Sequence, residues 1–174
     1  MADWRKGRVW KTGRVASMSI ILERTMRKSI KNYTTEIPVE KTLMEVQSLL
    51  ASKGAQKIMI EYESGAPSGL TFLLETPKVQ IPIRLPARVA NVEKFMHNKR
   101  RTIVHKISIK RAIAEQAQRT AWRNIKDWID AQIALIETEM VTMQEVFFPY
   151  IVMGENTIFE RFESGSLQLE QGRE

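Results

Sequence analysis

The chain has 174 residues, a length typical of one domain, and its 43% of hydrophobic residues are enough for a sizeable core. It contains no cysteine, which excludes disulfides, thiolate nucleophiles and thiolate metal sites, and only two histidines. No apolar run approaches the roughly 20 residues of a membrane-spanning helix. We therefore expect a soluble, cytoplasmic protein that holds no metal and no cofactor.

The net charge of +7 indicates a polyanionic partner, but the basic excess is unevenly placed. Residues 1–25 contain six basic and two acidic side chains, together with Trp4 and Trp10, and show no lasting apolar periodicity. They are predicted to form a basic, disordered tail. The alternative is that the working protein starts at Met26. In both cases residues 26–163 are expected to form one α+β domain, followed by a polar tail at 164–174.

The first predicted elements precede a glycine at position 54. Tyr33–Ile37 has the composition of a strand and stops at Pro38. A helix is predicted over Val39–Lys53, because apolar residues recur there along one side: Leu43, Val46, Leu49 and Leu50. Pro38 suits the start of this helix, and Gly54 suits the left-handed residue just past its end.

Three segments then alternate apolar and polar residues with the period of a half-buried strand: Lys57–Tyr62, Leu70–Glu75 and Val79–Leu85. Turn residues separate them, with Gly65 and Gly69 interpreted as turn glycines. The three strands are therefore predicted to form an antiparallel meander. Pro82 cannot donate a ladder hydrogen bond, so the third strand should lie at an edge.

Two helices are predicted next, a short one at Val89–His97 and a long one from about Ile109 to Met140. The long helix keeps apolar residues at spacings of three or four: Ile113, Ala117, Ala121, Ile125, Ile129, Ile133, Ile136 and Met140. At 1.5 Å per residue it would be about 48 Å long, more than a small sheet can cover. We therefore predict a homo-oligomer whose interface includes Trp128, Ile133, Ile136, Phe147 and Phe148.

The rest of the chain is predicted to cap this arrangement. Thr142-Met143-Gln144-Glu145 matches a capping box and should open a short helix that Pro149 disturbs. The apolar residues 146–148 and 150–153 are expected to be buried, and one more short element is predicted around Ile158–Phe162. The element order is thus a helix, an antiparallel three-strand meander, and a long C-terminal helix with a short capping helix.

The titratable residues form no recognisable catalytic set. Asp127 and Asp130 share one side of the long helix with neighbouring cations, which favours a solvated, ion-paired face over a catalytic carboxylate pair. His105 has no serine, cysteine or carboxylate placed by the sequence to work with it. We therefore predict that the protein is not an enzyme.

The basic residues give a clearer signal. Outside the tail they gather before the long helix and along one of its faces: Lys99, Arg100, Arg101, Lys106, Lys110, Arg111, Arg119 and Arg123. Such a strip could neutralise several phosphates. The alternative is a solvated helix face with ordinary ion pairs, and both interpretations remain open. Trp122 and Trp128 could stack on bases, but their place in the isoleucine stripe favours a core or an interface.

Several motifs resemble a known family over about Tyr33–Met153. They are RTAWRNIKDWIDAQ at 119–132, its continuation into IET at 136–138 and VFFPY at 146–150, and IPVEKT at 37–42. The chain resembles an uncharacterised family of small phage- and prophage-borne proteins. The resemblance implies a viral or mobile-element product that acts in a prokaryotic cytoplasm, and it assigns no chemistry to any residue.

The element order is also similar to the core of phage single-strand annealing proteins. Those proteins form rings or filaments and bind DNA along a basic groove, which would correspond here to Lys99–Lys110 and the face of Arg119 and Arg123. We therefore predict a phage-type, non-enzymatic protein that binds single-stranded nucleic acid. The alternative is an oligomeric interaction module that binds a host or viral protein.

Overall fold

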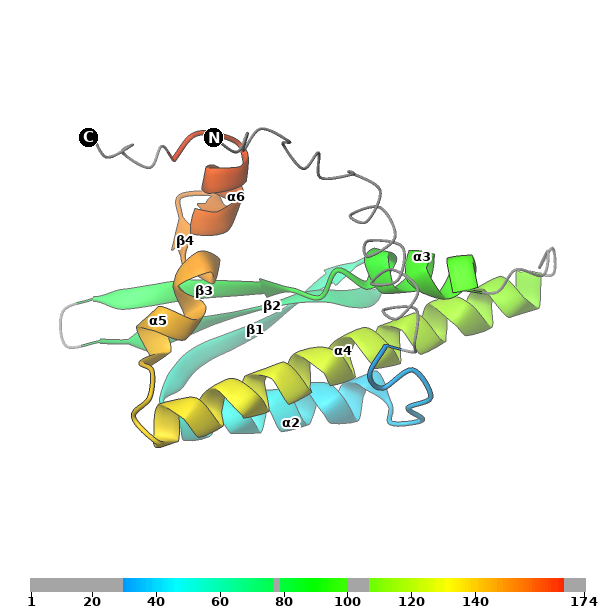
Figure 1. Cartoon of the computed structure of the whole chain (residues 1–174), viewed down its shortest axis with the longest axis horizontal. Helices are drawn as coiled ribbons and strands as arrows, with labels where there is room; N and C mark the ends of the chain where they lie inside the picture. Colours follow the sequence, from blue (N-terminus) through cyan, green and yellow to red (C-terminus); the bar gives the residue numbers. More distant parts are fainter. Residues whose placement is uncertain (1–29, 77–78, 100–106, 168–174) are drawn as a thin grey trace, which may run out of the picture. The chain divides into compact units, whose positions relative to one another are not determined.

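The structure, a computed structural model, describes residues 30–76, 79–99 and 107–167 (Figure 1). The chain divides into two units, Met1–Lys31 and Asn32–Glu174, and every element named here belongs to the second. In chain order the elements are α2 (Val39–Ser52), β1 (Ala55–Glu63), β2 (Ala66–Glu75), β3 (Gln80–Pro86), α3 (Val89–Lys99), α4 (Ile107–Glu137), α5 (Met143–Phe147), the 3-10 helix η1 (Phe148–Tyr150), β4 (Val152–Met153), β5 (Asn156–Thr157) and α6 (Ile158–Glu163).

The three long strands form an antiparallel sheet in the order β1-β2-β3, which confirms the α+β class and the meander. The first hairpin is tighter than the sequence predicted. Glu63 pairs with Ala66, and the two residues between them, Ser64 and Gly65, have φ of 51° and 81°. Positive φ at both positions is what a two-residue type I′ turn requires. β2 therefore begins at Ala66 rather than at Leu70.

The sequence suggested that Gly69 lies in a turn, but the structure places it inside β2. It is buried, and a Cβ added there would lie 3.0 Å from Glu61 Oε2. The Glu61 carboxylate also accepts a hydrogen bond of 2.6 Å from the Thr71 hydroxyl. The missing side chain therefore makes room for a carboxylate that lies across the pair of strands.

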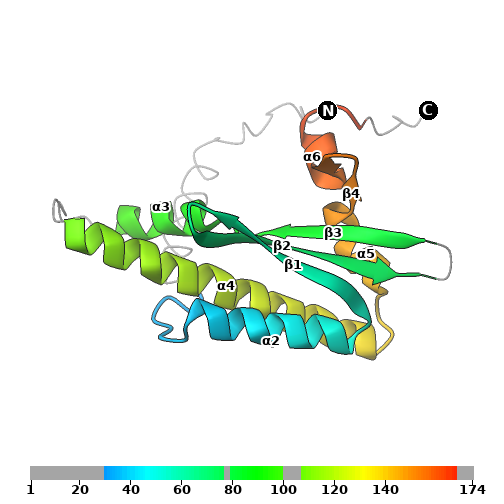
Figure 2. The ribbon, with the colours of Figure 1, turned by 180° about the vertical axis from the view of Figure 1, so that it is seen from behind.

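Two helices cover one face of the sheet. Figures 1 and 2 show α2 and α4 side by side beneath the strands, and both run in the same direction. Ion pairs join them near the middle, between Glu45 and Arg123, and at their ends, between Lys53 and Glu137. The core between helices and sheet contains, among its largest fully buried side chains, Leu50, Phe72, Ile83, Trp122 and Phe147.

The apolar stripe of α4 is covered within the chain. The helix ends at Glu137, three residues before the predicted Met140, which is exposed, and Glu139 turns the backbone with φ of 57°. α3 packs along the first part of α4, and α2 and the sheet pack along the rest. The stripe is buried from Ile113 to Ile133 at most of its positions. We expected the apolar stripe to extend beyond the part that the rest of the chain can cover, and this expectation is therefore wrong.

The predicted strand at Tyr33–Ile37 is also wrong. The segment is irregular and lies against α4, which supplies the hydrogen bonds that a neighbouring strand would otherwise provide. Gln116 Nε2 donates to the carbonyls of Tyr33 and Thr35, both at 2.9 Å, and the buried Thr120 hydroxyl donates to the carbonyl of Asn32 at 3.1 Å. Because these carbonyls are bonded to helix side chains, the backbone needs no strand partner.

The segment from α5 to α6 closes the edge of the sheet at β3. Phe147 enters the core and meets Phe72 and Trp128 edge-on, at ring distances of 5.5 and 5.7 Å. Ile151 then bridges to Ile83 of β3. The β3 strand, with its Pro82, is an edge strand of the three-stranded sheet, as predicted. Phe148 and Met153, predicted to be buried, are 55% and 46% exposed.

Both short helices of this segment begin with a capping box. Thr142 caps α5 through Glu145, as predicted, and Thr157 caps α6 through Glu160. Hydrogen bonds from the backbone of each threonine to the carboxylate lower the pKa of Glu145 and of Glu160. Glu160 also accepts a 2.8 Å bond from Arg84, so α6 is attached to β3.

Candidate functional site

The predicted nucleic-acid residues fall into two groups with different surroundings. Lys110 and Arg111 stand exposed at the start of α4, and the Arg111 side chain is 84% exposed although it pairs with Glu115 at 3.0 Å. The other predicted residues before α4 are Arg100, Arg101 and Lys106, which lie outside the described residues, and Lys99, whose side chain is not described.

Arg119 and Arg123, in contrast, are bound inside the fold. Arg123 Nη1 lies 2.5 Å from Glu45 Oε2 of α2, and its side chain is only 19% exposed. Arg119 donates to Gln116 Oε1 through Nη2, at 2.6 Å, and through Nε, at 3.2 Å. A phosphate at Arg123 would have to displace the Glu45 carboxylate, so this guanidinium is not a ready anion ligand. Arg119 is bonded to a neutral amide, which orients its side chain without neutralising its charge.

The same face of α4 continues with polar residues that hold the segment before α2. Gln116, Thr120, Asn124 and Asp127 follow each other at spacings of four, four and three, which places them in one row. Asn32 Nδ2 donates to Asn124 Oδ1 at 3.0 Å and to Asp127 Oδ2 at 2.9 Å. The neighbouring carboxylate, Asp130, pairs with Lys126. These contacts give Asp127 and Asp130 structural partners.

The predicted oligomer interface is corrected in part by the burial of its residues. Ile133 is 4% exposed and Phe147 is fully buried, so both belong to the core of a single chain and cannot meet a partner. Trp128 and Ile136 are half-buried. Phe148 alone of the five is well exposed, at 55%.

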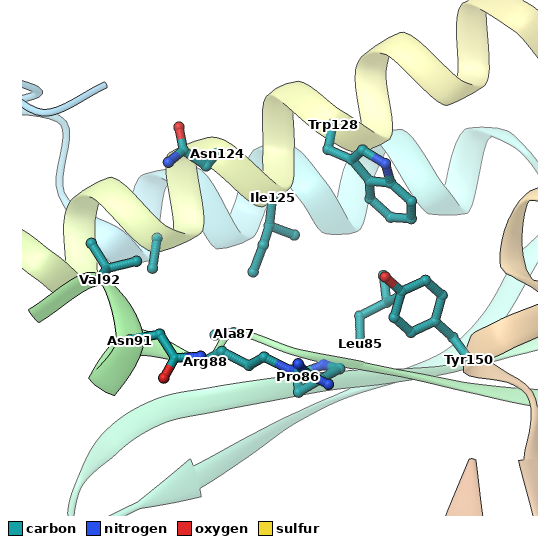
Figure 3. Close-up of a pocket in the computed structure, with 11 residues that line it drawn as sticks. Leu85, Pro86, Ala87, Arg88, Asn91, Val92, Asn124, Ile125, Trp128 and Tyr150 are labelled. Atoms are coloured by element: carbon teal, nitrogen blue, oxygen red, sulfur yellow. The ribbon is translucent and has the colours of Figure 1, made fainter. Parts of the chain in front are cut away.

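A pocket that the sequence did not predict lies where α3, α4 and η1 meet the end of β3 (Figure 3). Its volume is about 350 Å³, within the range of about 300–1,000 Å³ that is usual for small-molecule sites. The walls are mostly apolar, with Val92, Ile125, Trp128 and Tyr150, and the Tyr150 hydroxyl points into the space. We call it the α3–α4 pocket.

The polar groups of the α3–α4 pocket lie on α4 and at the start of α3. Asn91 and Arg88 come from the β3–α3 junction, and Asn124 comes from α4. Arg88 is the one charged residue among the described side chains that line the pocket, and its φ of 45° is unusual for a residue with a Cβ. Its guanidinium lies 5.8 Å from the centre of the Phe159 ring. These residues are far apart in the sequence, so no local spacing could reveal the pocket.

Within the described part of the chain, no group of three or more His, Cys, Asp and Glu side chains could hold a metal ion, and no helix is long and apolar enough to cross a bilayer. Comparisons of the chain with protein-family models, with curated proteins and with solved structures gave no match.

Proposed function

We propose that this protein binds single-stranded nucleic acid, without catalysing a reaction, at the end of the fold where α3 leads into α4. We call this the cationic end. One observation carries the proposal: residues 94–111 contain seven basic and no acidic side chains. The exposed members within the described residues are Lys94, Lys110 and Arg111.

The charge of the rest of the fold supports this choice of surface. Residues 30–76, 79–99 and 107–167 together contain 14 basic and 16 acidic side chains, so the folded body is slightly acidic while the whole chain is +7. Several body cations are paired, including Lys53, Arg84, Arg123 and Lys126. Phosphate contacts supply most of the affinity of non-specific binding, so binding should follow the cations that remain exposed.

The test is the salt dependence of binding to a fluorescently labelled single-stranded oligonucleotide. Changing both Lys110 and Arg111 to Gln should weaken binding and flatten the slope of log affinity against log salt by about 1.4, since each phosphate contact contributes about 0.7 for single strands. The matched control changes Lys41 and Lys57 to Gln, which removes the same charge from two exposed residues elsewhere. An equal loss in both variants, or no binding by the wild type at low salt, contradicts the proposal.

A second candidate, self-association through the C-terminal segment, rests on a different observation. Four large apolar side chains of this segment are exposed: Phe148, Met153, Phe159 and Phe162. Exposed apolar side chains gathered in one short segment favour a protein-binding surface. Light scattering of a Phe148→Asp, Phe162→Asp double variant should give a lower mass than the wild type. A wild-type protein that is monomeric at micromolar concentration contradicts this candidate.

A further inference from the structure

The α3–α4 pocket has a chemistry that the cationic end does not use. One wall consists of aromatic rings: Trp128 and Tyr150 meet at a centroid distance of 5.8 Å. Ile125 and Val92 complete the apolar lining, and Asn91 provides an amide at the rim (Figure 3). The Asn124 amide points away from these residues, and its carbonyl oxygen accepts a hydrogen bond from Asn32. A planar, apolar ligand with polar edges fits the lining of this pocket.

Arg88 gives the pocket a positive charge. It is exposed, and no acidic residue is among the described residues that line the pocket. Its backbone is held in the left-handed region, which costs about 1–3 kcal/mol for a residue with a side chain and often marks a functional position. The Phe159 ring beneath the guanidinium holds the side chain near the pocket mouth. The ligand should therefore carry a negative charge next to its planar group.

A row of exposed residues connects the pocket to the cationic end. Arg88 directly precedes α3, Asn91 and Lys94 follow within the helix, and all three are exposed. From Val89, the first residue of α3, to Lys94 the helix rises by about 7.5 Å. A charged chain that contacts Lys94 can therefore also reach Arg88 at the N-terminal end of α3.

We propose that the α3–α4 pocket receives one unstacked base of the bound single strand, while Arg88 contacts an adjacent phosphate. This inference rests on the proposed function and specifies where a nucleotide is held. Aromatic side chains bind bases of any kind by stacking, and an amide such as that of Asn91 can bond to base edges. Binding should accordingly be sensitive to the presence of bases and only weakly sensitive to their identity.

The experiment compares two ligands of equal length and charge: a thymidine homo-oligonucleotide and a chain of abasic deoxyribose phosphates. The wild type should bind the abasic chain roughly tenfold more weakly, because stacking of one base contributes about that much affinity. Val92→Trp fills the pocket from α3 and should remove this difference. Ala90→Trp, which adds the same ring to an exposed position of α3, should keep it.

A second variant tests the proposal even if Val92→Trp fails to fold. Arg88→Gly suits the positive φ at this position, so it should fold at least as well as the wild type. It should weaken binding of the homo-oligonucleotide and lower the salt slope by about 0.7.

The outcomes separate the two proposals. Equal binding of both ligands by the wild type, or an unchanged preference in a folded Val92→Trp protein, overturns the base pocket and leaves the cationic end in place. Failure to bind either ligand at low salt overturns the proposed function, and the base pocket with it. A preference that disappears in Val92→Trp and persists in Ala90→Trp supports both.

Discussion

The start of α4 and its middle contain the same kinds of residue in opposite situations. At the start, Lys110 and Arg111 stand in solvent, and the partner of Arg111 is an exposed Glu115 one turn away. In the middle, Arg119 and Arg123 are half-buried, and Arg123 is paired with a carboxylate of α2. Basic side chains recur along one helix, but those at its start stand in solvent while those in its middle are held by other side chains of the fold.

The difference arises from what packs on each stretch. α2 and the segment Asn32–Pro38 lie against the middle of α4, and their carboxylate and carbonyl oxygens accept hydrogen bonds from its polar side chains. A charge removed from water in this way needs a nearby partner, so the fold supplies one. Charge on a helix therefore indicates an interaction surface only after the contacts of that helix are known.

The largest expected effect tests whether the middle of α4 stabilises the fold more than its start does. Trp122 is fully buried, and its indole N–H donates to the carbonyl of Pro67 at 3.2 Å. Trp122→Ala should lower the free energy of unfolding by about 3–5 kcal/mol, measured by urea denaturation. Arg111→Ala is the control and should change it by less than about 0.5 kcal/mol. Similar values for the two variants would remove the contrast.

A smaller effect is expected for the polar row that holds Asn32–Pro38. Gln116→Leu leaves the carbonyls of Tyr33 and Thr35 without their donor, so the free energy of unfolding should fall by about 1–3 kcal/mol. Gln132→Leu changes the same residue type on the same helix, without a hydrogen bond to lose among the described residues. Hydrogen exchange should show faster opening around residue 35 only in the first variant.

The ion pairs should rank by their exposure. A double-mutant cycle on Arg123 and Glu45, using Gln at both positions, should give a coupling of about 1 kcal/mol. The same cycle on Arg111 and Glu115 should give about 0.3 kcal/mol, because these side chains are 84% and 54% exposed. Raising the salt concentration should abolish the second coupling before the first. The reverse order would show that burial does not distinguish the two stretches.

The smallest effect concerns a third arginine pair, between Arg84 and Glu160. The pKa of Glu160 is lowered, first by the backbone of Thr157 and further by Arg84. A carboxyl with a depressed folded pKa contributes stability that is present above its ordinary value of 4.5 and is lost as the pH falls below it. Glu160→Gln should therefore lower the thermal midpoint at pH 7 and hardly change it at pH 3. A loss of equal size at both pH values would contradict this role.

Periodicity predicted most of the fold, because burial of one face dictates the spacing of apolar residues. Leu43, Val46 and Leu50 lie in the core as the helical pattern requires, and the alternating residues of β2 and β3 do the same. The predictions failed where a distant partner decides the conformation. Tyr33–Ile37 lacks a strand partner because α4 binds its carbonyls, and the hydrophobic Phe148 remains exposed beside a buried Phe147.

The site was less accessible to sequence analysis than the fold. The exposure of Lys110 and Arg111 agrees with the basic strip that the sequence suggested, but the pairing of Arg123 with Glu45 joins residues 78 positions apart. The α3–α4 pocket likewise combines Arg88, Trp128 and Tyr150 from three separate segments. Such contacts depend on the packing of helices and strands, which spacing along the chain does not encode.

The two edges of the sheet bear on how the protein behaves when many copies are crowded together. At one edge Ile151 already bridges to Ile83. At the other, β1 is interrupted by an irregularity between Gln56 and Met59, where the charged Lys57 has φ of 49°. A bulged edge with a lysine is a poor template for a further strand. Crowded copies of the chain would therefore resist joining their sheets into fibrils.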